Sequence, residues 1–133
     1  MKKKILFIED DIPTLDVYGT ALKRAGFEVE TINFGQEAKE RVGLIKEGKV
    51  LRPDVVLLDL LLPDINGVEV LKEIRSHAET RDILVFILTN HTDQDPERMG
   101  HGVKPDAFLL KTDYTPQKLI AFLKERIDEE NGA

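Results

Sequence analysis

Six polar residues directly follow short apolar runs of the sequence, and their types suit phosphoryl or metal chemistry: Glu9, Asp10, Asp11, Asp59, Thr89 and Lys111. Carboxylates gathered in one place raise one another's pKa values unless a cation offsets their charge. Oxygen donors without histidine or cysteine suit a hard ion, and Mg²⁺ is typically held by one or two carboxylates. The pattern therefore predicts a Mg²⁺ site at this acidic group.

Asp59 can also act as a nucleophile, because aspartate is one of the side chains that form covalent phosphoryl intermediates. Phosphoryl transfer needs mainly positioning and neutralisation of the charge on the phosphoryl oxygens. Lys111 can supply a positive charge there, and Thr89 can supply a hydroxyl donor. Each of these residues is common alone, and only the set predicts a phosphoryl-transfer site.

The elements that must position these residues alternate regularly along the chain. Apolar and β-branched runs predict strands over 4–8, 27–31, 55–58, 83–88 and 107–110. Helical spacing, caps and breakers predict intervening helices near 13–25, 38–48, 68–74, 93–101 and 116–127. Strands alternating with helices predict an α/β fold with a parallel sheet, in which ligands bind at the carboxyl ends of the strands.

The composition bounds the function classes. The 133 residues fit one domain (1–133), with an ordered core over about 3–128 and a polar tail over 129–133. A net charge of −6 argues against nucleic-acid binding through phosphate neutralisation. The absence of cysteine and of a long apolar span leads us to expect a cytoplasmic protein with no membrane partner.

Four segments of the sequence resemble the receiver domains of two-component response regulators, and the resemblance covers nearly the full chain. The segments are the acidic opening 5–11, the phosphoacceptor segment 55–67 with Pro63 and Gly67, and the two switch segments 87–89 and 108–111. The resemblance implies a flavodoxin-like (βα)5 doubly wound sandwich with strand order 2-1-3-4-5.

The same resemblance implies a role for each matching residue. It identifies Asp59 as the phosphorylation site, and the metal ligands as Glu9, Asp10, Asp59 and the backbone carbonyl of Leu61. Thr89 and Lys111 are expected to contact the phosphoryl oxygens. Phe108 is expected to change rotamer when Thr89 moves.

The function implied by the resemblance is a signalling switch that catalyses only its own phosphorylation and dephosphorylation. Its expected phosphodonor is a sensor histidine kinase or a histidine phosphotransfer protein. Its expected output is contact with a downstream protein, through the fourth helix, the fifth strand and the fifth helix. We expect a monomer or a weak dimer linked to phosphorylation.

Several positions depart from the family's usual pattern. Asn90 stands where a small residue usually follows the switch threonine, and Thr112 stands where proline usually follows the lysine. The segment 102–105 replaces a common glycine–alanine pair. Leu61 and His91 flank the site where the family varies its hydrolysis rate.

Two other functions stay open from the sequence. One is a receiver-like interaction scaffold that is never phosphorylated, an alternative that Asn90 and Thr112 keep open. The other is an aspartate-nucleophile phosphohydrolase, against which Leu61 stands where a second acid would be needed. The segment 43–49 matches most of a phosphate-binding loop, but Val50 stands where Ser or Thr should bind Mg²⁺, so we reject that interpretation.

Overall fold

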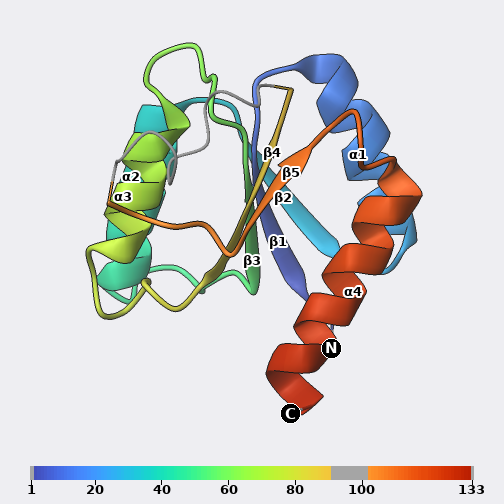
Figure 1. The fold of residues 1–133 in the computed structure, drawn as a ribbon. Helices are drawn as coiled ribbons and strands as arrows, with labels where there is room; N and C mark the ends of the chain where they lie inside the picture. Colours follow the sequence, from blue (N-terminus) through green and yellow to red (C-terminus); the bar gives the residue numbers. More distant parts are fainter. Residues whose placement is uncertain (1, 91–101, 133) are drawn as a thin grey trace.

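Five parallel strands form one sheet in the part of the chain that the structure describes. The computed structural model describes residues 2–90 and 102–132. The strands are β1 (Lys4–Ile8), β2 (Glu28–Ile32), β3 (Val55–Leu58), β4 (Leu84–Thr89) and β5 (Ala107–Leu110). Their order is β2-β1-β3-β4-β5, which confirms the order that the family resemblance implied (Figure 1). β2 and β4 each begin and end one residue later than predicted.

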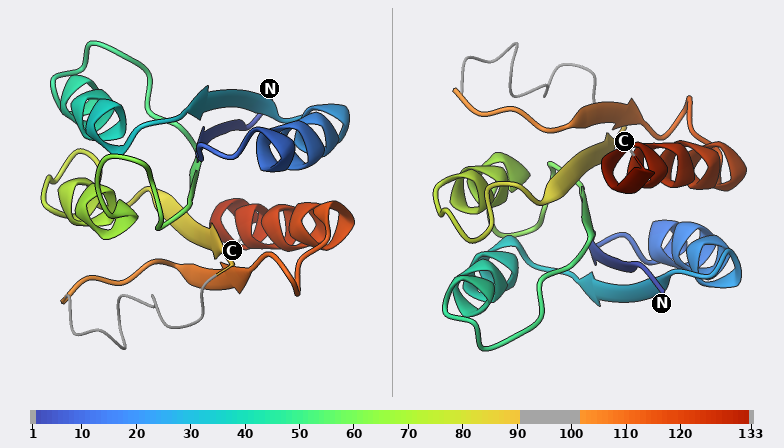
Figure 2. Two further views of the ribbon diagram at one scale, coloured as in Figure 1. Left: turned by 90° about the horizontal axis from the view of Figure 1, so that it is seen from above. Right: turned by 90° about the horizontal axis from the view of Figure 1, so that it is seen from below.

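The described helices cover both faces of the sheet. They are α1 (Ile12–Arg24), α2 (Gly35–Lys46), α3 (Gly67–Arg75) and α4 (Pro116–Gly132). Figure 2 shows α1 and α4 on one face and α2 and α3 on the other. The helix predicted near 93–101 lies outside the described residues. α4 continues to Gly132, so residues 129–132, predicted as a polar tail, extend the helix.

The two apolar layers follow from the alternation of side chains along each strand. In β1, Leu6 and Ile8 pack in the layer beneath α2 and α3, whereas Ile5 and Phe7 pack in the layer beneath α1 and α4. All four side chains are at most 2% exposed. Because both faces are covered, the strands are apolar throughout, and the first polar residues come where the strands end.

Helix caps begin two helices close to the strand ends. The Asp11 carboxylate accepts the Thr14 amide N–H at 3.0 Å and begins α1, where Pro13 suits the first turn. The Asn66 side chain accepts the Val68 amide N–H at 2.9 Å and begins α3. Each of the two connections that bear acidic residues therefore runs from the end of a strand, β1 or β3, to a capped helix.

At the opposite, amino edge of the sheet, Arg75 ties the connections before β4 and β5 to the end of α3. Its guanidinium donates to the carbonyls of Lys104, Arg81 and Ile83 at 3.1, 2.9 and 2.8 Å, and to the Asp106 carboxylate at 2.9 Å. Across residues 2–90 and 102–132, none of the helices has the length and apolar character needed to cross a bilayer.

Candidate functional site

Three carboxylates meet at the carboxyl edge of the sheet. β1 and β3 are neighbours, with Ile8 opposite Leu58, and the Asp59 amide donates to the Ile8 carbonyl at 3.0 Å. One carboxylate oxygen from each of Glu9, Asp10 and Asp59 lies within 4.8 Å of the others. The structure thus brings together the three acidic side chains that the sequence predicted as metal ligands.

Glu9 is fully buried in this cluster. Its Oε2 accepts the amide N–H groups of Asp10 and Asp11 at 3.1 and 3.3 Å. Burial raises the pKa of Glu9 to about 7, and the Asp59 carboxylate adds to the rise, while a hydrogen bond from Lys111 opposes it. A further cation beside Glu9 and Asp59 would favour the ionised form of Glu9.

Lys111 follows β5, which is separated from β3 by β4, and its side chain brings a positive charge to the acids. Its ammonium forms an ion pair with Oε1 of Glu9, and its Nζ lies 3.9 Å from Oδ2 of Asp59. The Lys111 side chain is only 10% exposed. Its backbone N–H donates to the Thr89 carbonyl at 2.8 Å, so the ends of β4 and β5 are joined beside the acids.

The connection after Asp59 is fixed by a close approach of Gly67. The Gly67 N–H donates to the Leu60 carbonyl at 2.7 Å, and a Cβ at Gly67 would lie 2.4 Å from the Asp59 carbonyl oxygen. Leu61 forms an isolated antiparallel bridge with Asn66 and exposes 43% of its surface. Its carbonyl stays a predicted metal ligand, two residues beyond Asp59.

Asp64, in the same connection, holds the beginning of α2. Its two carboxylate oxygens accept the Gly35 and Gln36 amide N–H groups at 2.8 and 2.9 Å. These backbone donors lower the pKa of Asp64, with the Gln36 N–H as the largest cause. The turn that bears Leu61 is thereby anchored to a neighbouring helix.

Thr89 and Phe108 lie on neighbouring strands near this edge. Thr89 is the last residue of β4 and is fully buried, while Phe108 pairs with Ile87 in the β4–β5 register. Phe108 is partly buried against the apolar layer beneath α2 and α3. This placement agrees with the predicted positions, and the phosphoryl contact of Thr89 and the rotamer change of Phe108 stay predictions.

The sequence analysis did not identify the hydrogen bond of Tyr18. Tyr18 follows Leu15 and precedes Leu22 at helical spacing, and the structure buries it to 8% exposure. Its hydroxyl donates to the Tyr114 carbonyl at 2.7 Å, in the connection that follows Lys111. The available signal was the phenol itself, because a buried tyrosine hydroxyl usually finds a partner.

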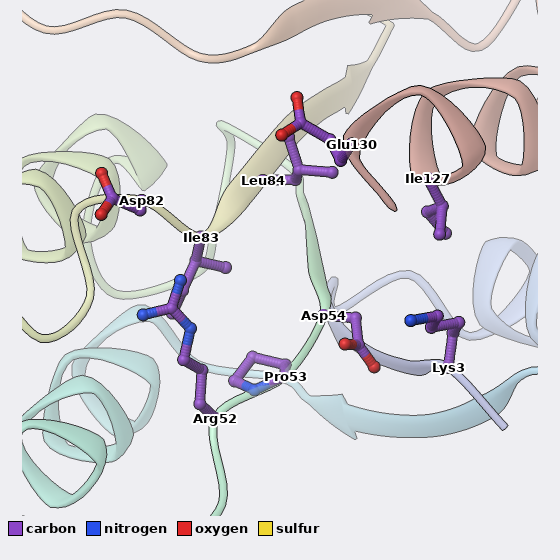
Figure 3. A pocket seen from close by; sticks show the side chains of 9 residues that line it. All are labelled: Lys3, Arg52, Pro53, Asp54, Asp82, Ile83, Leu84, Ile127 and Glu130. Atoms are coloured by element: carbon purple, nitrogen blue, oxygen red, sulfur yellow. The ribbon is translucent and has the colours of Figure 1, made fainter. Parts of the chain in front are cut away.

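Other candidate groups lie away from the acids. A pocket of about 250 Å³ opens at the amino edge, where Figure 3 shows side chains of both charges, among them Lys3, Arg52, Asp54, Asp82 and Glu130. The segment 43–49 ends α2 instead of linking a strand to a helix, which agrees with its rejection as a phosphate loop. His77 pairs with Glu73, and His91 and His101 lie outside the described residues.

The donor set fits Mg²⁺. The described cluster offers carboxylate oxygens, one of them on exposed Asp10, and contains no histidine or sulfur ligand. Mg²⁺ prefers such oxygens and keeps several waters, for which an exposed edge leaves room. Glu9, Asp10 and Asp59 are the side chains that would hold the ion.

Comparisons with known proteins define the class. Residues 5–124 match the response regulator receiver domain family. The DNA-binding response regulator MtrA of Mycolicibacterium paratuberculosis is 30% identical over 127 residues, which is 96% of this chain and 52% of that protein. The chain therefore belongs to the response regulator receiver domain family, and it spans about half the length of this curated relative.

Solved structures agree with this assignment. The phosphorylated cyanobacterial phytochrome response regulator RcpA shares 27% identity and a TM-score of 0.78, over 96% of this chain and 93% of its own. A receiver domain of a sensor histidine kinase from Pseudomonas aeruginosa PAO1, solved with a magnesium ion in its active-site cleft, has the same fold at 22% identity and a TM-score of 0.77, over the whole of both chains. Because MtrA is a DNA-binding protein, the expectation of no nucleic-acid contact has no support from these comparisons.

Proposed function

We propose that the protein is a phosphoacceptor switch of a two-component system, in which Asp59 receives a phosphoryl group from a histidine kinase or a histidine phosphotransfer protein. The observation that carries the proposal is the position of Asp59 between acids and a cation. Asp59 is 7% exposed, its carboxylate lies in the oxygen cluster with Glu9 and Asp10, and the Lys111 Nζ is 3.9 Å from its Oδ2.

The proposed reaction is an in-line displacement at phosphorus. A carboxylate oxygen of Asp59 forms the new P–O bond while the P–N bond of phosphohistidine breaks, and the electron pair of that bond stays on the departing imidazole. The Lys111 ammonium would offset charge on one phosphoryl oxygen, and the Thr89 hydroxyl would donate to another. A bound Mg²⁺ supplies charge neutralisation and orientation of the phosphoryl oxygens.

Before phosphorylation, Lys111 has a different partner from the one proposed for it afterwards. The ammonium is paired with Glu9. An unpaired buried carboxylate at this position would destabilise the folded protein. When a phosphoryl group is attached to Asp59, its oxygens would compete with Glu9 for the same ammonium. The proposed switch is a shift between these two pairings, which favours one of two arrangements of the carboxyl ends of β4 and β5.

The downstream partner belongs to the same proposal. We propose that the partner binds a surface near β5 and α4, the helix over 116–132 that the sequence analysis counted as the fifth. Thr89 and Lys111 connect the acid site directly to these elements. The curated relative MtrA is about twice as long and is a DNA-binding response regulator. A partner protein or a further segment of chain could therefore receive the signal.

Intact-mass spectrometry after incubation with acetyl phosphate tests the proposal. Wild type with Mg²⁺ should gain one phosphoryl group, and Asp59→Asn and an EDTA-treated sample should gain none. Asp16→Asn, which removes the same charge from an exposed position of α1, is the matched control and should behave as wild type. The absence of an adduct in wild type would overturn the proposal and favour an unphosphorylated scaffold.

A further inference from the structure

Tyr18 connects α1 to the turn that follows Lys111. Its ring is packed in the apolar layer beneath α1 and α4, and the residue is 8% exposed. Its hydroxyl donates to the Tyr114 carbonyl at 2.7 Å and lies 3.4 Å from the Lys111 carbonyl. The shorter contact is the main hydrogen bond, since one hydroxyl proton serves one acceptor well.

The turn after Lys111 is built around one carbonyl. The N–H groups of Asp113 and Tyr114 donate to the Leu110 carbonyl at 3.0 and 3.1 Å, which folds the chain back after β5. Thr112 lies exposed in this turn and, unlike proline, does not fix its own φ angle. The turn therefore has two hydrogen bonds of its own, and the Tyr18 hydroxyl adds one from outside, at the Tyr114 carbonyl.

The backbone of Lys111 is held directly by one hydrogen bond and indirectly by the turn that Tyr18 contacts. Its N–H donates to the Thr89 carbonyl at 2.8 Å, and its carbonyl faces the Tyr18 hydroxyl. The flexible Lys111 side chain must place its ammonium between Glu9 and Asp59 from this backbone position. A small shift of the turn would move the ammonium away from the acids, and small misplacements are costly in reactions that depend on positioning.

We propose that Tyr18 is a positioning residue for Lys111, whose hydroxyl fixes the turn 111–114 so that the ammonium meets a phosphoryl group on Asp59. The inference rests on the proposed function and deepens it. It also gives α1 a part in the reaction beyond packing. The metal ligands belong to other connections, so Tyr18 should affect phosphoryl transfer without affecting Mg²⁺ affinity.

Thr80 offers a matched control for the loss of a buried hydroxyl. It is fully buried, and its Oγ1 donates to the Ile74 carbonyl at 2.7 Å, the same kind of bond at the same length. It lies after α3, before the strand β4 begins, and takes no part in the acid site. Thr80→Val should lower stability without changing the phosphorylation rate of the folded protein.

The test compares wild type, Tyr18→Phe and Thr80→Val under conditions where circular dichroism shows all three to be folded. Three quantities are measured: the rate of phosphorylation by acetyl phosphate at saturating Mg²⁺, the Mg²⁺ dissociation constant by calorimetry, and the hydrogen exchange of peptides covering 107–118. We expect Tyr18→Phe to slow phosphorylation roughly three- to tenfold, the range that one net hydrogen bond supplies. We expect unchanged Mg²⁺ affinity and faster exchange confined to the turn.

Two outcomes overturn the inference while the proposed function stands: equal phosphorylation rates in wild type and Tyr18→Phe, or an equal slowing in Thr80→Val. A loss of Mg²⁺ affinity in Tyr18→Phe that matches the loss of rate would also overturn it, because it would indicate a general distortion of the acid cluster. If wild type gains no phosphoryl group, the proposed function itself fails and the inference fails with it.

Discussion

The Nζ atom of Lys111 lies 3.9 Å from Oδ2 of Asp59, although β4 separates the strands that end at these two residues. The same ammonium reaches Glu9 at the end of β1, one strand further. One side chain therefore crosses the carboxyl edge of the sheet and contacts two of the three acids. Replacing Lys111 should slow phosphoryl transfer to Asp59, and it should also leave Glu9 without its ion-pair partner.

Lys111→Met should slow phosphorylation of Asp59 by acetyl phosphate at least tenfold. The physical reason is that preorganised positive charge on a reacting oxygen is typically worth more than a factor of ten. Binding of Mg²⁺ should persist, because the acids remain. Phosphorylation rates from intact mass and Mg²⁺ titration by calorimetry check both parts. A variant that reacts at the wild-type rate would remove Lys111 from the proposed mechanism.

Mg²⁺ should stabilise the folded protein, because an ion that binds only the native state adds its binding free energy to the free energy of unfolding. At a Mg²⁺ concentration ten times the dissociation constant, the gain is about 1.4 kcal/mol, and EDTA should reverse it. Thermal unfolding followed by circular dichroism measures the effect. Asp10→Asn should reduce it, whereas Asp16→Asn, an exposed acid on α1, should leave it intact.

Gly67→Ala should destabilise the protein by about 3 kcal/mol, because its Cβ would lie 2.4 Å from the Asp59 carbonyl oxygen and 2.9 Å from the Leu60 Cα. Gly43→Ala is the control. It lies within α2 with no atom within 4 Å of an added Cβ, and it should stabilise the protein by about 0.5 kcal/mol. Urea unfolding gives both values. Equal effects at the two positions would contradict the close approach.

Glu30 should contribute stability that depends on pH. A hydrogen bond from Arg41 is the main cause that lowers the pKa of Glu30 to about 2, and Lys4, whose Nζ is 3.2 Å from Oε1, adds to it. Because the pKa is depressed in the folded state, the stabilisation is present above the unfolded value of 4.5 and is lost as the pH falls toward 2.

The measurement is urea unfolding of wild type and Glu30→Gln between pH 2 and pH 7. Since the Glu30 side chain is 34% exposed, solvent screening reduces the expected difference to about 1 kcal/mol near neutral pH. Glu28→Gln, an exposed acid on the same strand, is the control and should show little difference. A Glu30→Gln difference that stays constant down to pH 2 would exclude this ion-pair network as its source.

Much of this architecture could be predicted from the sequence, because fully buried parallel strands leave a clear apolar pattern. The bounds of β1, β3 and β5 agree with the sequence prediction. β4 includes Thr89, which the sequence placed just after the strand, because the Thr89 backbone continues the ladder opposite Leu110. A residue pattern cannot fix that last pairing, which depends on the neighbouring strand.

The end of α4 shows a different limit. The acidic residues after Ile127 suggested a tail, yet the helix continues to Gly132. Glutamate is a good helix former, and polar residues stay helical when one face is solvated. Burial, which guided the sequence prediction, does not decide the end of such a helix.

The site was predictable in its members but not in its contacts. The order of the strands brings Glu9, Asp10 and Asp59 together, and that order followed from the family resemblance. The ion pair between Lys111 and Glu9 depends on how a long side chain crosses two strand ends, and the bond from Tyr18 depends on the path of the turn 111–114. Neither contact can be predicted from the spacing of residues in the sequence.

The course of α4 has a practical consequence. The helix runs away from the acid site, and its last half shares a surface pocket with Lys2 and Lys3, through Lys124, Ile127 and Asp128. Figure 1 shows the beginning of β1 and the end of α4 together at the amino edge of the sheet. A purification tag or fluorophore attached at either end would lie across the molecule from Asp59, so the protein can be immobilised on a sensor chip with its reactive edge facing the solution.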